Sequence, residues 1–353
     1  MKVAPLYHEL SKAQWCAPIL VHTGQHYDAN MSGHFFEDLQ LPHPHYFLGI
    51  GGGSHGEQLG QTLMAYERLC REETPDFVVV VGDVNATLSC SLIASRLQVP
   101  LGHVEAGLRS RDRGMPEEIN RILTDQLSDI LWTPSEDADA NLKAEGVCPD
   151  KISFVGNIMI DSLVFMQPTF EDLNFPDQIG MGGTEYAVVT AHRPSNVDTP
   201  ESLALIVDTL TQAAERIQLV FPCHPRTIKN LKEFGMEDKV LNNPRIKVLE
   251  PQGYKEFMSL VLNAKVIITD SGGIQEEATY MNIPCLTMRE TTERPITVDQ
   301  GTNVVTPPSQ LPESVLTALD QVLSGDWKDG HCPPLWDGKT AGRIRQDLEK
   351  ILL

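Results

Sequence analysis

Short runs of apolar, mostly β-branched residues alternate with longer segments of helical periodicity along the chain. The run Phe77–Gly82 is almost continuously apolar, as expected for a parallel strand covered by helices on both faces. This alternation predicts repeated βα units and therefore an α/β protein with doubly wound parallel sheets. The predicted strands are Pro18–Thr23, Phe77–Gly82, Leu101–Glu105, Ile130–Thr133, Tyr186–Ala191, Gln218–Pro222, Arg245–Leu249, Val266–Thr269 and Pro284–Met288.

Several helix starts are readable between these strands. Ser54 and Glu57 have the spacing of a capping box, which predicts a helix from there to about Cys70. Pro116 is followed by two glutamates, the residue types favoured in a first helical turn. A last amphipathic helix is predicted over Lys339–Leu353.

The length of 353 residues exceeds one ordinary core and predicts two domains. Pro, Asp and Gly cluster in Gln167–Gly183, where we expect the linker, and Gly325–Gly338 is a second irregular stretch. The expected domains are therefore residues 1–167 and 168–338, followed by a final helix over 339–353. Two Rossmann-like halves predict a ligand cleft lined by the carboxyl ends of strands.

The charge balance narrows the class of partner. With 28 basic and 48 acidic residues, the formal net charge is −20, which argues against a nucleic-acid or anionic-membrane partner. A local basic pocket can still bind a small anion. The N-terminus does not read as a signal peptide, and no run approaches the roughly 18 apolar residues of a membrane span. The seven cysteines are scattered without a C-x-x-C, so we predict reduced thiols, a cytoplasmic location and no metal site.

Carboxylates follow two predicted strands of the first half. Asp83 comes just past one strand and Glu105 ends the next, so both are expected at the same sheet edge. Such a pair suits acid–base work or sugar binding, although a single Asp after a strand is often only a turn former. Glu117 is a third candidate. The alternatives for Glu117 are a first-turn acid or an i,i+4 ion pair with Arg121.

Basic residues follow two strands of the second half. His192 and Arg193 come directly after one strand, and His224 and Arg226 follow the next in the same way. This repetition favours an anion site, and a histidine there is also able to transfer protons.

The segment Asp270–Glu277 carries the sharpest signal. A β-branched strand ends at Thr269, Gly272 and Gly273 allow a close backbone approach, and a helix follows whose free amides suit phosphate. Glu277, two turns further on, is placed to accept ribose hydroxyls. Arg294 lies after another strand, where it either clamps a phosphate or pairs with Glu293.

Four motifs occur together and in order: His103–Arg109, Pro116–Arg121, Asp270–Glu277 and Arg289–Pro295. The set closely resembles the non-hydrolysing UDP-N-acetylglucosamine 2-epimerases over essentially the whole chain. The resemblance implies a glycosyltransferase-B fold, whose final helix returns to the first domain. It also implies a homodimer that binds a UDP-sugar, needs neither metal nor dissociable cofactor, and supplies precursors of surface polysaccharides.

Site residues are carried over from the family by position. The resemblance implies catalytic roles for Asp83, Glu105, Glu117 and His192. It implies contacts with the UDP-sugar for the remaining residues, which are Lys2, Arg121, Arg193, Gln252, Phe257, Ser271, Gly272, Gly273, Glu277 and Arg294. The reaction implied is anti-elimination of UDP to 2-acetamidoglucal, followed by re-addition of UDP.

Two stretches depart from the family pattern. Family members begin with a strand and a Gly-Thr-Arg-Pro-Glu loop, whereas Lys2 here matches the lysine that follows that loop. The resemblance therefore predicts a first sheet without a usually central strand, and a gain of stability and activity when about thirteen preceding residues are added. The run Gln25–Asn30 also differs from that of family members activated by a second UDP-N-acetylglucosamine.

Other functions stay open from the sequence. The same motifs suit the epimerisation of a modified sugar such as UDP-2,3-diacetamido-glucuronic acid. A glycosyltransferase with the same nucleotide-binding half is a second alternative, which acceptor-dependent transfer would reveal. A nucleotide-binding protein without turnover is the non-enzymatic alternative.

Overall fold

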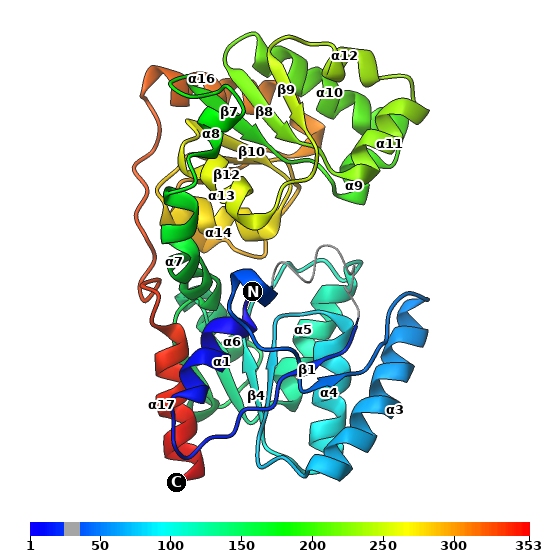
Figure 1. The fold of residues 1–353 in the computed structure, drawn as a ribbon, viewed down its shortest axis with the longest axis vertical. Helices are drawn as coiled ribbons and strands as arrows, with labels where there is room; N and C mark the ends of the chain where they lie inside the picture. Colours follow the sequence, from blue (N-terminus) through cyan, green and yellow to red (C-terminus); the bar gives the residue numbers. More distant parts are fainter. Residues whose placement is uncertain (25–35) are drawn as a thin grey trace. The chain divides into compact units, whose positions relative to one another are not determined.

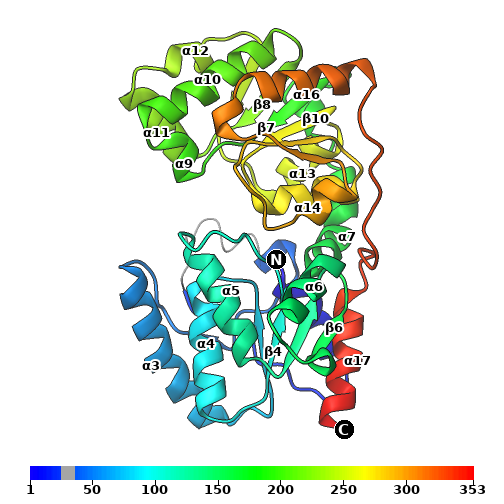
Figure 2. The ribbon, with the colours of Figure 1, turned by 180° about the vertical axis from the view of Figure 1, so that it is seen from behind.

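The computed structural model describes residues 1–24 and 36–353, and the run Gln25–Asn30 lies outside the described residues. The chain forms two compact units (Figures 1 and 2). Unit 1 comprises Met1–Phe165 and Pro334–Leu353, and unit 2 comprises Met166–Pro333. For comparison, the domain ranges predicted from the sequence are 1–167, 168–338 and 339–353.

Unit 1 contains parallel strands in two sheets. β1 (Val21–His22) pairs with β2 (Tyr46–Phe47). The larger sheet has the order β3-β4-β5-β6, with β3 at Val78–Val81, β4 at Leu101–Val104, β5 at Ile130–Thr133 and β6 at Ile152–Phe154. The helices of this unit are α1 (Val3–Ser11), α3 (His55–Glu73), α4 (Asn85–Arg96), α5 (Pro116–Leu127), α6 (Glu136–Ala144), most of α7 (Ile158–Glu171) and α17 (Thr340–Leu352), with a 3₁₀ turn at Pro149–Lys151.

The sheet of unit 1 is covered on both faces, as the apolar run over β3 predicts. Val78 and Val80 pack with Tyr66 of α3 and Ile93 of α4. On the other face, α1 and α17 lie side by side and pack against Val104 and Trp132 (Figure 1). The period of two along the strands therefore divides the core into two layers. Val79 and Val81 are only half-buried, and β3 has no neighbour on its outer side among the described strands.

The predicted helix starts are confirmed. Ser54 accepts a hydrogen bond from the Glu57 amide, and the Glu57 side chain accepts from the Ser54 amide, which completes the capping box of α3. Pro116 opens α5, with both glutamates in its first turn.

Unit 2 has one parallel sheet of order β12-β11-β10-β7-β8-β9. The chain runs outward from β7 (Tyr186–Val189) through β8 (Gln218–Pro222) to β9 (Ile246–Leu249). It then returns to β10 (Val266–Thr269), beside β7, and continues through β11 (Cys285–Thr287) to β12 (Asn303–Val305). The direction of winding therefore reverses between β7 and β10, and at such a switch point the carboxyl ends of the strands leave a crevice for ligands.

The helices of unit 2 complete a doubly wound arrangement with a large core between the sheet and α10 and α16. They are α8 (Phe175–Gln178), α9 (Pro194–Val197), α10 (Pro200–Ala214), α11 (Pro225–Glu233), α12 (Glu237–Leu241), α13 (Tyr254–Leu262), α14 (Gly272–Tyr280), α15 (Ile296–Asp299) and α16 (Glu313–Ser324), with a 3₁₀ turn at Pro308–Gln310.

All nine predicted strands are present, with ends that differ by up to three residues. The short strands β2, β6 and β12 were not predicted. The predicted linker stretch 167–183 is not irregular throughout, because α7 continues to Glu171 with Pro168 inside it and α8 follows. The fold class of Rossmann-like units with parallel sheets, as in the glycosyltransferase-B fold, is confirmed.

Candidate active site

Two carboxylates of unit 1 follow neighbouring parallel strands. Asp83 comes two residues after β3, and Glu105 directly follows β4. Glu105 has a φ of 71°, an uncommon left-handed conformation for a residue with a side chain. The carbonyl of Trp132 accepts hydrogen bonds from the amides of Glu105 and Ala106, which holds this turn. The side chain of Glu105 is 4% exposed and forms an ion pair with Lys2 Nζ over 2.5 Å.

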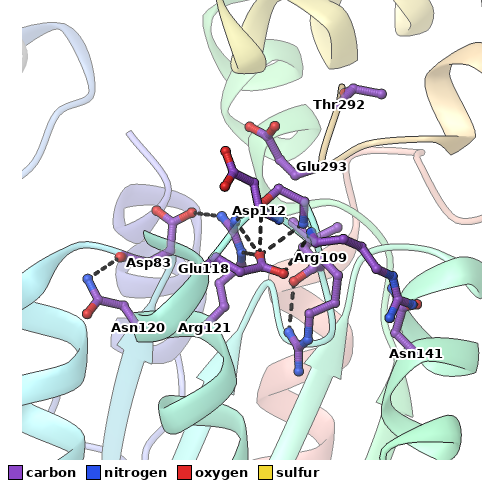
Figure 3. A network of polar contacts seen from close by, with 12 residues as sticks. Asp83, Arg109, Asp112, Glu118, Asn120, Arg121, Asn141, Thr292 and Glu293 are labelled. Carbon is purple, nitrogen blue, oxygen red and sulfur yellow. Dashed lines mark hydrogen bonds and ion pairs between the residues drawn. The ribbon is translucent and has the colours of Figure 1, made fainter. Parts of the chain in front are cut away.

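Arg121 connects two acidic side chains at the same edge. Its guanidinium contacts Asp83 Oδ2 over 2.5 Å and Glu118 Oε2 over 2.7 Å (Figure 3). Asn120 donates a hydrogen bond to the Asp83 carbonyl. Arg121 is 2% exposed, and the structure therefore places it as a support for Asp83 rather than as an open anion-binding group. Its role in binding substrate stays a prediction.

Glu118, rather than Glu117, is the partner of Arg121. Glu118 Oε2 also accepts from the amide and hydroxyl of Ser110, and Oε1 accepts from the Arg111 amide. Burial alone would raise the pKa of Glu118, but these donors and Arg121 hold it below its usual range. The i,i+4 alternative for Glu117 is wrong. The Glu117 side chain is half-buried and has no hydrogen bond or ion pair among the described residues, so its carboxylate is available to a ligand.

A fully buried histidine joins the elements that carry these carboxylates. His103 contacts Asp125 Oδ1 through Nδ1 over 2.6 Å and the Gly82 carbonyl through Nε2 over 2.9 Å. Asp125 lies on α5, and Gly82 precedes Asp83. Burial would raise the pKa of Asp125, but His103 and Arg109 keep it below its usual range. β3, β4 and α5 are thus tied together below the candidate site.

In unit 2, the predicted basic residues lie at the switch point between β7 and β10. His192 and Arg193 follow β7, and Asp270 follows β10. The His192 side chain is 42% exposed, and its ring centroid lies 5.8 Å from that of His224. Burial, followed by the nearby charges of His192 and Arg226, lowers the pKa of His224. Arg193 Nε donates to the Asp270 carbonyl, so this arginine is held at the carboxyl end of the neighbouring strand, β10.

The glycine loop opens directly onto α14. Ser271 is the N-cap residue of this helix, and its side chain makes no capping hydrogen bond. A Cβ added to Gly272 would lie 2.7 Å from Glu293 Oε1, whereas one added to Gly273 would meet no atom within 4 Å. A side chain at residue 272 would therefore displace the Glu293 carboxylate, and the space beside Gly273 is open to a ligand. Free amides at a helix N-terminus favour phosphate there.

Glu277 also lies on α14. Gln252 and Phe257 are near the start of another helix, α13. The Glu277 side chain accepts a hydrogen bond from the Tyr254 hydroxyl over 2.8 Å, and the residue is 3% exposed. Burial raises the pKa of Glu277 to about 7. Gln252 donates to the Glu250 carbonyl, and Phe257 is half-buried one helical turn after Tyr254. The positions suit a nucleoside between α13 and α14.

The structure shows Arg294 in the second of its two predicted roles. Arg294 is 6% exposed, Nε lies 2.8 Å from Glu276 Oε2, and Nη1 lies 3.2 Å from Glu293 Oε1. Arg289 contacts the other oxygen of Glu293. Burial would raise the pKa of Glu293, but Arg294 and Arg289 bring it to about 2. These ion pairs brace the glycine loop through Glu293 and Gly272.

The sequence analysis missed Glu118, Asp125, Tyr254, Glu276 and Asp270 as supports of the site. The signal for Asp270 and Glu118 was their place inside the motifs; Asp125 and Tyr254 had none. Within residues 1–24 and 36–353, no cluster of His, Cys, Asp and Glu has the arrangement of a metal site. The described helices include none of the length and hydrophobicity that a bilayer crossing requires.

Residues 8–349 match the UDP-N-acetylglucosamine 2-epimerase family. The chain is 42% identical to the UDP-N-acetylglucosamine 2-epimerase of Methanococcus maripaludis, over 98% of this chain and 93% of that protein. It is 40% identical to UDP-2,3-diacetamido-2,3-dideoxy-D-glucuronate 2-epimerase of Pseudomonas aeruginosa, over 99% and 96%. Its structure is similar to that of Methanocaldococcus jannaschii UDP-GlcNAc 2-epimerase in complex with UDP-GlcNAc and UDP, with a TM-score of 0.89, 42% identity and coverage of 99% and 96%.

Proposed function

Because the chain belongs to the UDP-N-acetylglucosamine 2-epimerase family, we propose that it interconverts UDP-N-acetylglucosamine and UDP-N-acetylmannosamine. The observation that carries the proposal is the presence of two complementary sets of groups on one chain. Unit 2 offers amides and a histidine to a diphosphate at its switch point. Unit 1 offers carboxylates at its strand ends.

The chemistry needs both sets. The hydrogen on carbon 2 of the sugar is weakly acidic, because no carbonyl is attached to that carbon. In the elimination, a base takes this proton, a double bond forms between carbons 1 and 2, and the bond from carbon 1 to UDP breaks. Return of the proton to the opposite face of carbon 2, with re-addition of UDP, gives the epimer.

Different residues are proposed for proton transfer and for binding of UDP. Asp83, Glu105 and Glu117 are the candidates for removing and returning the proton. Lys2 holds Glu105, and Arg121 holds Asp83. The amides of Ser271–Gly273, together with His192, stabilise the departing diphosphate and keep it bound for re-addition. Glu277 accepts the ribose hydroxyls.

A solvent-exchange experiment tests the reaction. Turnover in heavy water is expected to place deuterium at carbon 2 of the product, because a proton held on a carboxylate exchanges with solvent. Proton NMR of the recovered UDP-sugars measures this incorporation. Complete retention of the original hydrogen during turnover would contradict the elimination.

Binding of UDP tests the nucleotide half separately. Glu277→Ala removes two charge-assisted hydrogen bonds to the ribose and is expected to weaken UDP binding by about 2–3 kcal/mol without loss of the fold. Titration calorimetry measures the affinity, and Glu201→Ala, an exposed residue on α10, is the control. Unchanged affinity in Glu277→Ala would remove this residue from the site.

The Pseudomonas relative favours a specific second candidate, the epimerisation of UDP-2,3-diacetamido-2,3-dideoxy-D-glucuronate. Comparison of kcat/KM for the two sugars decides between them. Formation of a glycosidic product with an added acceptor would instead indicate a transferase.

We also propose the remaining properties that were predicted from the sequence. These are a homodimer, a cytoplasmic location and a role in supplying precursors of surface polysaccharides. Light scattering coupled to size-exclusion chromatography measures the oligomeric state directly, and a monomer would contradict the first of them.

A further inference from the structure

Asp270 is a buried carboxylate that joins the two strand ends of the switch point in unit 2. The residue has no exposed surface. Its Oδ2 accepts hydrogen bonds from the amides of His192 and Arg193, both over 2.8 Å, and from the side chain of Asn196 over 3.2 Å. Its Oδ1 lies 2.8 Å from Nδ1 of His192. All of these partners follow β7, whereas Asp270 follows β10.

The contacts indicate that Asp270 is ionised. Burial alone would raise the pKa of Asp270, but the His192 side chain and the two amides hold it below its usual range. An ionised carboxylate only accepts hydrogen bonds. Since two acceptors do not share a 2.8 Å contact favourably, Nδ1 of His192 carries a proton.

We propose that Asp270 is a positioning residue that keeps His192 protonated at Nδ1 and directs its Nε2 toward the diphosphate of the ligand. The ring nitrogens of His192 have no other partner within the described part of the chain, and the side chain is 42% exposed. Nε2 is therefore the nitrogen left for a ligand.

The same residue couples this histidine to the phosphate loop. Asp270 immediately precedes Ser271–Gly273, and its own carbonyl accepts a hydrogen bond from Arg193 Nε. Displacement of the Asp270 side chain would therefore alter the aim of His192 and the start of α14 together. This consequence for catalysis rests on the proposed function, whereas the protonation of Nδ1 does not.

The wild-type chain provides the first test. In protein labelled with ¹⁵N-histidine, two-dimensional NMR between ring nitrogens and ring protons identifies the protonated nitrogen, and His192→Gln assigns the signal. We expect Nδ1 of His192 to be protonated at every pH from 6 to 8. An unprotonated Nδ1 would overturn the proposal without any variant of Asp270.

Asp270→Asn provides the second test, because the amide is nearly isosteric. Its oxygen will take the place of Oδ2 on the backbone amides, so its NH₂ group will face Nδ1 and require that nitrogen to accept. We therefore expect the proton to move to Nε2 and kcat to fall by at least ~100-fold, with KM changed less than kcat. Asp208→Asn, an exposed carboxylate on α10, should alter neither quantity.

The outcomes separate the inference from the proposed function. An Asp270→Asn protein that keeps the Nδ1 proton and the wild-type kcat would overturn the inference. A chain without epimerase activity that still shows the proton shift would support the inference and contradict the function.

Discussion

The hydroxyl of Tyr254 donates a hydrogen bond to Glu277 over 2.8 Å, at a carboxyl group that is almost completely enclosed by protein. Burial raises the pKa of Glu277 to about 7, and the hydrogen bond from Tyr254 opposes that effect only in part. Near neutral pH, therefore, the carboxyl group proposed to bind the ribose is protonated in about half of the unliganded molecules.

We predict that UDP affinity rises with pH through the pKa of Glu277. Both ribose hydroxyls donate, so the binding form is the ionised one. At pH 6 only about a tenth of the molecules are in this form, and affinity is expected to be about tenfold lower than at pH 8. Calorimetric titrations at pH 6, 7 and 8 measure the UDP affinity. The phosphate of UDP also titrates in this range, so the pH dependence in Glu277→Gln is the reference. The same dependence of UDP affinity on pH in the wild-type protein and in Glu277→Gln would contradict the prediction.

We also predict that Glu277→Gln stabilises the unliganded protein at pH 8. Glu277 titrates at about 7 in the folded chain, against the ordinary 4.5 when unfolded. Between these values the folded chain holds a proton that the unfolded chain has released, so wild-type stability falls as pH rises. The uncharged variant avoids this loss, worth up to about 3 kcal/mol by pH 8. Urea unfolding should show the difference at pH 8 and little at pH 5. A less stable variant at pH 8 would contradict the sign.

Removal of the Arg121 guanidinium is expected to be costly. Arg121→Met leaves Glu118 buried without its cation and Asp83 without its contact, for a loss of about 3–5 kcal/mol in the free energy of unfolding. Arg216→Met removes an exposed pair with Asp320 and should cost less than about 1 kcal/mol. Urea unfolding compares the two variants, and equal losses would show that burial is not the decisive factor.

Two glycines of unit 1 should respond oppositely to alanine. A Cβ on Gly102 of β4 would overlap the buried Trp132 indole and lie 3.1 Å from Ile130, so Gly102→Ala is expected to cost about 1–3 kcal/mol. Gly60 lies in α3 with no atom near its Cβ position, and Gly60→Ala should gain up to ~1 kcal/mol. Thermal melting shows whether each variant is more or less stable than the wild-type protein. A neutral Gly102→Ala would mean that Trp132 moves freely.

Strands were predictable where β-branched residues formed continuous runs, as in Val78–Val81 and Val266–Thr269. β2, β6 and β12 span only two or three residues, too short for a period to be visible. The stretch 167–183 contains more helix than predicted because Pro168 is tolerated within α7 and Pro176 lies in the first turn of α8, a position that prolines favour.

Asp83, Glu105, His192 and Gly272 were proposed from strand ends and the glycine loop, whereas Lys2, Gln252 and Phe257 came only from the family resemblance. The partners of these residues were not predictable. Arg121 pairs with Glu118 three positions away and with Asp83 on another element. Asp270 contacts His192 across 78 positions because β7 and β10 are neighbours in the sheet. Such pairings depend on the order of the strands in the sheet, which local sequence patterns do not determine.

The return of α17 to unit 1 has a consequence for how the chain folds during synthesis. Ala341, Ile344 and Leu348 of this helix complete the core around Trp132, and the amides of Thr340 and Ala341 donate to Asp161. Every residue of unit 2 leaves the ribosome before α17 does. Unit 2 is therefore able to finish folding on the ribosome, whereas unit 1 has only α1 on that face of its sheet until α17 emerges. Nascent chains that end before residue 340 and are held on the ribosome by an added linker that clears the exit tunnel should show a protease-resistant unit 2 and a protease-sensitive unit 1.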